Sequence, residues 1–276
     1  MLAYPSTRKL RRALEANVIS NCPVTSSDVL TAFRIYGPNP EALVGKTIRR
    51  PSRTVELPSN DRYPVSLDPK YRRIVVCADV VTINTVKFLT TTIPTLKHST
   101  ATPIEDENRE TMWDALRPTL VKYQAAGCVI ADFRGDGGFK CLKDVIVAQG
   151  VGVANITSRD EHEPHIERFH RTLEERVRCL LCTFVNRYEL KQTFRFPRKI
   201  IIGAVRFSIM MINAITPESG ISGTLSPGAL FDDIHLNYNV HCRLRFLQYV
   251  QMHHESTNTM SRRTSAALNL GPTGDR

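Results

Sequence analysis

Three acidic side chains have the types and the spacing of a site for divalent cations. Asp79 lies within residues 74–83, a nearly continuous apolar and β-branched run. Asp136 follows a shorter apolar run and is flanked by glycines, and Glu167 lies at the start of a long amphipathic segment. Clustered carboxylates repel one another, and hard cations such as Mg²⁺ relieve that repulsion because they favour oxygen ligands. Two such ions can activate a nucleophile and stabilise a leaving oxygen in phosphoryl transfer.

Asp79 is the charge that most needs an explanation. Its apolar surroundings predict a strand buried on both faces in the middle of a sheet. A carboxylate there is costly unless it is paired, protonated or bound to a cation. The alternative is an aspartate at a strand edge that faces solvent. Functional groups of open sheets gather at strand ends, so Asp136 and Glu167 would have to meet Asp79 there for a site to form.

The elements that must position these side chains follow from the apolar periodicity. The pattern predicts a strand, a turn at Asn84 and Thr85 that makes a hairpin, and then alternating helices and strands. Strands are expected at residues 74–83, 87–93, about 96–103, 128–131 and 150–154, and helices at 107–126, 140–148, 162 to about 185, and 199–214. The predicted fold class is α/β, a mixed sheet flanked by helices with an antiparallel hairpin at its start.

Composition shifts along the chain predict three regions. Residues 1–68 are expected to form a small helical and linker region with helices at 8–16 and 29–35. Residues 69–216 hold the α/β core. Residues 217–276 are expected to form a partial β-rich region, with a loop around residues 220–228 and short strands at 242–251 and 265–270.

Length and composition exclude several classes of protein. The chain has 276 residues, of which 42% are hydrophobic and 23% charged, as in a soluble globular protein. No apolar run approaches the roughly 20 residues of a membrane span, and the N-terminus does not have the pattern of a secretory signal. Seven irregularly spaced cysteines indicate reduced thiols rather than a disulfide framework.

Positive charge favours a polyanionic partner. The net charge is +10 and the isoelectric point is about 9.4. Between residues 168 and 199 there are nine Lys and Arg against three Glu, a net +6. Of these, Arg168, Arg171, Arg178 and Lys199 are candidates to contact DNA phosphates, which position a protein without reading sequence. The alternative is a solvated helix face.

Other residues compete for the same roles. Asp132 is the rival of Asp136, although it lies inside the strand end rather than on the glycine-flanked turn. Glu163 is the rival of Glu167, although it precedes Pro164. A zinc site is a third possibility; its ligands would be His162, His165, Cys179 and Cys182. One continuous helix would separate the two pairs by roughly 20 Å, which argues against zinc and for cysteines that pack in the core.

Two motifs carry a specific resemblance. Residues 134–139 (RGDGGF) resemble the D-N-G-G-E-F loop, and residues 166–173 (IERFHRTL) the x-E-R-x-x-R-x-L helix, of retroviral and retrotransposon integrases. Asp136 follows Asp79 by 57 residues and Glu167 follows Asp136 by 31, close to that family's spacing. Further segments in shared order resemble the integrase region of Ty1/copia-like Pol polyproteins: 21–25, 35–38, 45–47, 174–178, 220–222, 226–227, 241–244, 249–251, 263–264 and 270–274.

The resemblance implies an RNase H-like integrase core. Asp79, Asp136 and Glu167 would hold Mg²⁺ or Mn²⁺ and serve metal-dependent trimming of DNA ends and strand transfer. The implied partners are double-stranded DNA, both element ends and target, and further copies of the chain, with no membrane; the implied location is the host nucleus, reached through the cytoplasm. The loop lacks the family's asparagine after Asp136 and its glutamate before Phe139. A catalytically decayed DNA-binding remnant and an RNase H-like nuclease therefore stay open as alternatives.

Overall fold

The computed structural model describes residues 7–15, 22–37, 69–156, 164–191, 193–215, 217, 220–221, 226–232, 244–254 and 263–271. The chain divides into two compact units, and each is considered by itself. The larger unit spans residues Asn60–Gln248 and Asn269–Arg276, and the smaller one Met1–Ser59 and Tyr249–Leu268. The division predicted from composition, at residues 68 and 216, stays a prediction.

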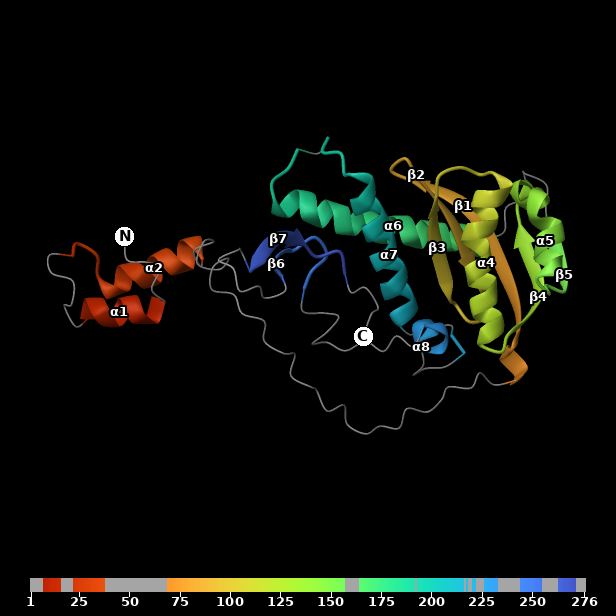
Figure 1. Cartoon of the computed structure of the whole chain (residues 1–276), viewed down its shortest axis with the longest axis horizontal. Helices are drawn as coiled ribbons and strands as arrows, with labels where there is room; N and C mark the ends of the chain where they lie inside the picture. The colour runs from red at the N-terminus through yellow and green to blue at the C-terminus, as the bar shows by residue number, and fades with distance from the viewer. Residues whose placement is uncertain are drawn as a thin grey trace. The chain divides into compact units, whose positions relative to one another are not determined.

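A five-stranded mixed sheet is the centre of the larger unit, with the strand order β3-β2-β1-β4-β5 (Figure 1). The strands are β1 (Arg73–Ile83), β2 (Val86–Thr92), β3 (Ser99–Ile104), β4 (Val129–Gly135) and β5 (Val153–Ile156). The first three are antiparallel neighbours, whereas β4 runs parallel to β1 and β5 parallel to β4. The predicted α/β class, a mixed sheet flanked by helices, is confirmed.

The β1–β2 hairpin turns through two residues. Ile83 pairs with Val86, and between them Asn84 and Thr85 have φ of 46° and 68°. Positive φ at both central positions is the type I′ geometry, which matches the twist of the flanking strands. Asparagine tolerates this conformation, but a β-branched threonine does so only with strain. The predicted turn is confirmed.

Helices cover both faces of the sheet. They are α4 (Arg109–Ala125), α5 (Lys143–Ala148), α6 (Pro164–Arg187), α7 (Arg198–Ala214) and α8 (Pro227–Phe231). Ile74, Val76 and Ala78 of β1 join one hydrophobic cluster with α4, which crosses the near face in Figure 1. The alternate residues Cys77 and Val81 join a second cluster with α6 and α7 on the other face. Asp79 lies between these two in sequence and therefore shares the α6 side.

A series of buried hydrogen bonds attaches α8 to the face of the sheet that α4 covers. His98 is fully buried; its Nδ1 lies 3.0 Å from the Tyr123 hydroxyl and its Nε2 lies 2.9 Å from Oδ2 of Asp232. The second carboxylate oxygen of Asp232 accepts from Lys122. Phe231 packs against both rings, with centroid distances of 4.7 Å to His98 and 5.2 Å to Tyr123. His98, Tyr123 and Asp232 thus each have a polar partner, as burial requires.

A side chain of α7 binds the free edge of the outer strand β3 at the first residue of that strand. Asn213 is buried and its amide forms two hydrogen bonds with the backbone of Ser99. The N–H of Ser99 donates to Oδ1 at 3.0 Å, and Nδ2 donates to the Ser99 carbonyl at 2.8 Å. The amide therefore occupies the position that a neighbouring strand would take.

The smaller unit contains a helix pair and a strand pair. The helices are α1 (Thr7–Glu15) and α2 (Ser26–Tyr36), and the antiparallel strands are β6 (Tyr249–His253) and β7 (Thr264–Leu268). Thr25 caps α2 in a capping box: its side chain accepts from the N–H of Asp28, whose carboxylate in turn accepts from the N–H of Thr25. Both predicted helices are confirmed, with bounds that differ by up to three residues.

Some sequence predictions of elements need correction. The order of strands and helices in the core is confirmed, but β4 continues four residues beyond the predicted end at 131. Pro227 and Gly228, expected in a loop, open helix α8, because Ser226 caps it by accepting from the N–H of Ala229 and Pro suits the first turn. β6 starts at Tyr249, and residues 242–243 lie outside the described part. No helix in the described ranges is long and apolar enough to cross a membrane.

Candidate active site

Asp79 and Asp136 occupy adjacent positions at the end of the β1–β4 pairing. The last paired residues of these parallel strands are Ala78 and Gly135; Asp79 is the next residue of β1, and Asp136 is the first residue after β4. Paired strands lie about 5 Å apart, so the two backbones are close at this point. Asp79 shares the face of Cys77, on the α6 side, whereas Asp136 lies just beyond β4, where the chain turns into a short 3₁₀ helix.

Backbone hydrogen bonds hold Asp79 in place. Its side chain is 24% exposed, and Oδ1 accepts from the N–H of Val80 at 2.7 Å. Thr90, its cross-strand partner on β2, donates its hydroxyl to the carbonyl of Asp79 at 2.8 Å. The aspartate is thus half-buried in the central strand rather than at a sheet edge, where a solvent-facing role was the alternative.

His170 on α6 contacts the same residues and was not expected from sequence. Its Nε2 lies 2.7 Å from the Thr90 hydroxyl and its Nδ1 lies 3.8 Å from Oδ2 of Asp79. The single Thr90 proton is already given to the Asp79 carbonyl, so Nε2 must donate and carries the proton. Burial lowers the pKa of His170 to about 4, so the ring is neutral near pH 7 and makes no ion pair with Asp79.

Asp136 opens the glycine-rich turn after β4. It is the N-cap of the short 3₁₀ helix η2 (Gly137–Leu142), and its Oδ1 accepts from the N–H of Gly138 at 3.0 Å. A Cβ on residue 138 would lie 3.1 Å from that oxygen, so glycine permits the close approach. Capping alone would explain an aspartate here, and the register beside Asp79 is what adds a second role.

Glu167 reaches this region from α6. It is exposed and lies one helical turn before His170, so the two side chains project from the same side of the helix. A turn of three residues rises about 4.5 Å. Because His170 contacts Asp79, Glu167 lies on the part of α6 that is nearest the middle of β1. Its rival Glu163 lies outside the described residues.

The types of the three candidate side chains suit a bound metal ion, but their placement does not bring them together. Carboxylate oxygens are the ligands that Mg²⁺ and Mn²⁺ favour, and all three candidates supply them. Within the described ranges, however, no three His, Cys, Asp or Glu side chains lie close enough together to hold a metal ion. Oδ1 of Asp79 and Oδ1 of Asp136 already accept backbone N–H groups. The ligands have the right type, and Glu167 would have to approach the two aspartates.

Asp132, the rival of Asp136, has a structural role. Its two oxygens accept from Nε of Arg134 at 2.8 Å and from Nδ2 of Asn155 at 2.7 Å. Asn155 belongs to β5, and Asp132 pairs with Val153 on that strand. Asp132 therefore fastens two parallel strands, which supports Asp136 as the functional aspartate.

The sequence pattern for zinc does not converge in space. His165 lies in the first turn of α6, and Cys179 and Cys182 lie four turns further along the same continuous helix; His162 is outside the described residues. Both cysteines are exposed. The expectation that they pack in the core is therefore wrong: they fall beside the buried stripe, which contains Val177 and Leu181.

The four candidate DNA-contacting residues are all exposed. Arg168, Arg171 and Arg178 lie along α6, and Lys199 lies in the first turn of α7. In the part of the chain that the structure describes, none of the four forms an ion pair with a carboxylate. Their charge is therefore available to an anionic partner. Their role in DNA contact stays a prediction.

Comparisons with known proteins give distant structural likenesses. No protein-family model matches the sequence, and no curated protein matches it either. The catalytic core domain of BIV integrase is similar, with a TM-score of 0.39 and 12% identity over 58% of this chain and 93% of that one. The HTLV-2 integrase catalytic core in complex with magnesium, in a trimeric form, has a TM-score of 0.39 and 10% identity over 57% and 95%. At these values the likeness assigns no activity to this chain.

Proposed function

We propose that this chain is a retrotransposon integrase of the Ty1/copia type, which trims DNA ends and joins them to target DNA. The observation that supports the proposal is the register of β1 and β4, whose pairing ends at Ala78 and Gly135, the residues directly before Asp79 and Asp136. A chance pair of acidic residues would not be expected directly after the last paired residues of two central parallel strands. Ends of parallel strands are where open sheets gather functional groups.

Asp79, Asp136 and Glu167 would hold the metal ions. Bound Mg²⁺ or Mn²⁺ would lower the pKa of a nucleophilic water or 3′-hydroxyl and stabilise the leaving oxygen. The chain itself orients the donors. The N–H of Val80 fixes one oxygen of Asp79, and the N–H of Gly138 fixes one oxygen of Asp136. Such backbone contacts reduce the reorganisation that ligands need before they bind.

The positive charge of the second half supports DNA as the substrate. Arg168 and Arg171 follow Glu167 directly on α6, and Arg178 and Lys199 extend the charge away from the carboxylates. Each phosphate contact releases counterions and adds to the salt dependence of binding. We expect DNA affinity to fall steeply between low and physiological salt. Because phosphate contacts carry no sequence information, target choice would be broad.

A strand-transfer assay tests the proposal. The full chain is incubated with oligonucleotide duplexes that carry element-end sequence, a target duplex and either Mg²⁺ or Mn²⁺. We expect joined product from the wild type and none from Asp136→Asn, because the amide keeps the capping acceptor and removes the charge. Equal product from both proteins would remove Asp136 from the mechanism.

A catalytically decayed DNA-binding remnant is a second candidate. The observation that favours it is that, across the described residues, three metal-ligating side chains do not converge. It predicts salt-dependent DNA affinity without metal-dependent joining. Calorimetric titration with Mn²⁺ separates the two candidates: an integrase binds the ion and loses it in Asp79→Asn, whereas a remnant shows no such binding in either protein.

Location and assembly follow from the proposed reaction. Joining two DNA ends to one target requires at least two active sites, so we expect further copies of the chain in the working complex. Action on chromosomal DNA requires access to the nucleus of the host cell.

A further inference from the structure

An aromatic cluster lies where α6 ends and the chain leads into α7. Phe184 packs against Tyr188 with a centroid distance of 4.7 Å and against Phe196 at 5.8 Å. Phe194 meets the edge of Phe196 at 5.0 Å. Tyr188 and Phe194, at the outside of the cluster, are each 42% exposed. Two rings thus remain open to solvent although inner rings hold them in place.

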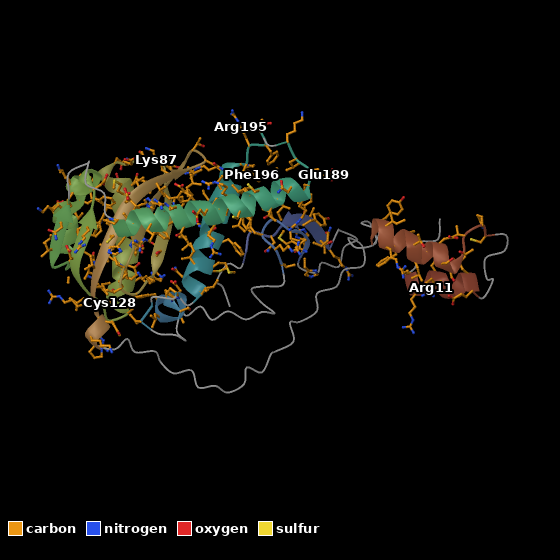
Figure 2. All side chains as sticks on the ribbon, turned by 180° about the vertical axis from the view of Figure 1, so that it is seen from behind. Arg11, Lys87, Cys128, Glu189, Arg195 and Phe196 are labelled. Carbon is orange, nitrogen blue, oxygen red and sulfur yellow. The ribbon has the colours of Figure 1, made fainter. Side chains whose placement is uncertain are left out.

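Positive charge surrounds these rings. Residues 187–199 contain five Lys or Arg and one acidic residue, Glu189, a net +4. Figure 2 shows Arg195 and Phe196 on the connection and Glu189 at the end of α6. The basic residues are Arg187, Lys191, Arg195, Arg198 and Lys199. Among the described residues none of these five pairs with a carboxylate, so their charge is not neutralised within the fold.

A pocket of about 610 Å³ opens beside the cluster, between α6 and the tip of the β1–β2 hairpin. Phe196 is one wall, so the aromatic cluster and the pocket are continuous. Its apolar lining includes Val177 and Phe196, and its polar lining includes Asn84, Glu174, Arg178 and Asn186. An apolar lining interrupted by amide and charged groups suits a flat heterocycle whose edge carries donors and acceptors.

We propose that the α6–α7 connection binds a single-stranded nucleic acid segment, with bases stacked on Tyr188 and Phe194 and an unpaired base in the adjoining pocket. Grooves for single strands combine basic residues that follow the backbone with aromatic rings on which bases stack. Both parts occur here within one short segment. A duplex already stacks its own bases, so these rings would add little to duplex binding.

The inference rests on the proposed function in one respect only, the choice of nucleic acid as ligand. It does not involve Asp79, Asp136 or Glu167, which lie at the other end of α6. For an integrase, a single-stranded contact of this kind would hold an unpaired strand at a distance from the joining site, roughly the length of α6. A protein surface is the competing occupant, but the net charge of +4 over residues 187–199 favours a polyanion.

Fluorescence anisotropy with the full chain tests the inference. A labelled single-stranded oligonucleotide and the corresponding duplex are titrated at fixed salt against wild type and the Tyr188→Leu/Phe194→Leu double variant. Leucine keeps apolar packing and removes the aromatic face. We expect the variant to lose about tenfold or more in single-strand affinity, with duplex affinity changed less than twofold.

Two controls keep the result specific. Tyr249→Leu replaces a tyrosine of similar exposure, 49%, outside this cluster and should leave both affinities unchanged. Circular dichroism verifies that the double variant is folded. Equal single-strand affinity in wild type and double variant overturns the inference, as does an equal loss for both ligands. A change in self-association alone, seen by sedimentation, would indicate a protein interface and would also overturn it.

The same titration separates this inference from the proposed function. Asp136→Asn should abolish joining without changing single-strand affinity, and the double variant should reduce single-strand affinity while the metal-binding carboxylates stay intact. Absence of joining in the wild type would contradict the proposed function. The inference about single-stranded binding would then be judged by the anisotropy data alone.

Discussion

Nδ1 of His170 lies 3.8 Å from Oδ2 of Asp79, while Nε2 of the same ring donates to the Thr90 hydroxyl. Thr90 in turn donates to the Asp79 carbonyl. One side chain of α6 therefore touches both the carboxylate and the strand partner of the central aspartate. Through this contact the helix that carries Glu167 is tied to the strand that carries Asp79.

His170→Ala should weaken the attachment of α6 to β1 and β2. Loss of the partly buried ring and of its hydrogen bond is expected to lower the free energy of unfolding by roughly 1–3 kcal/mol. It should also reduce strand transfer more than DNA affinity, because the helix that carries Glu167 would no longer be fixed against the strand that carries Asp79. Urea unfolding and parallel joining and binding assays measure the two effects. His165→Ala, an exposed residue on the same helix, is the matched control, and identical joining by both variants would contradict the positioning role.

Gly138→Ala should displace the Asp136 carboxylate. The added Cβ would lie 3.1 Å from Oδ1, closer than the carboxylate can accept without turning away from its N–H partner. We expect joining activity to fall toward that of Asp136→Asn while the fold persists. Gly203→Ala is the control, because its Cβ would meet Leu270 at 3.4 Å, an ordinary contact. Full activity of the residue-138 variant would show that this hydrogen bond does not orient Asp136.

Thr85→Gly should stabilise the protein. Thr85 has φ of 68° in the type I′ turn, and Asn-Gly is the preferred pair for that geometry. Removing a strained β-branched residue is expected to raise the free energy of unfolding by roughly 1 kcal/mol, less the added entropy of the unfolded chain. Urea denaturation at constant slope measures the change. A lower midpoint for the variant would mean that the turn is not adopted in solution.

Mild acid should destabilise the protein through His98. Burial lowers the pKa of His98 from 6.5, although the hydrogen bond from its ring to Asp232 acts in the other direction. In the unfolded chain the imidazole takes up a proton as pH falls through 6.5, whereas in the folded chain it stays neutral until lower pH. The unfolded state then binds more protons, so stability is fully present above about pH 6.5 and falls as pH drops below it.

The other groups of this network act at different pH. Burial alone would raise the pKa of Asp232, but hydrogen bonds and charge from His98 and Lys122 lower it, so its contribution is lost only in strong acid. Burial raises the pKa of Tyr123, which stays protonated throughout. Urea unfolding at pH 5, 6 and 7 gives the free energy of unfolding at each pH, and we expect it to change less with pH for His98→Gln than for wild type. Some pH dependence should persist, because burial also lowers the pKa of His170. An unchanged pH dependence in the variant would exclude His98 as its source.

Local patterns predicted most of the sheet and supplied the candidate residues of the site. Apolar runs and the Asn84-Thr85 turn indicated the hairpin. The charge of Asp79 within an apolar strand made it a candidate, and the rule that functional groups gather at strand ends led to Asp136. His170 was missed because its contact with Asp79 depends on how α6 crosses β1, which no local pattern encodes. Helix α8 was missed because Pro227 and Gly228 are common in loops, while the cap from Ser226 decides the outcome.

The amide of Asn213 has a consequence for how copies of this chain meet. Strand β3 is an outer strand, and unpaired backbone groups on such a strand invite a second sheet to extend it. The amide already binds the N–H and the carbonyl of Ser99. These two backbone groups are therefore not available to pair with a strand from a second sheet. Assembly of several copies is thereby steered away from sheet extension at this end, toward contacts made by side chains.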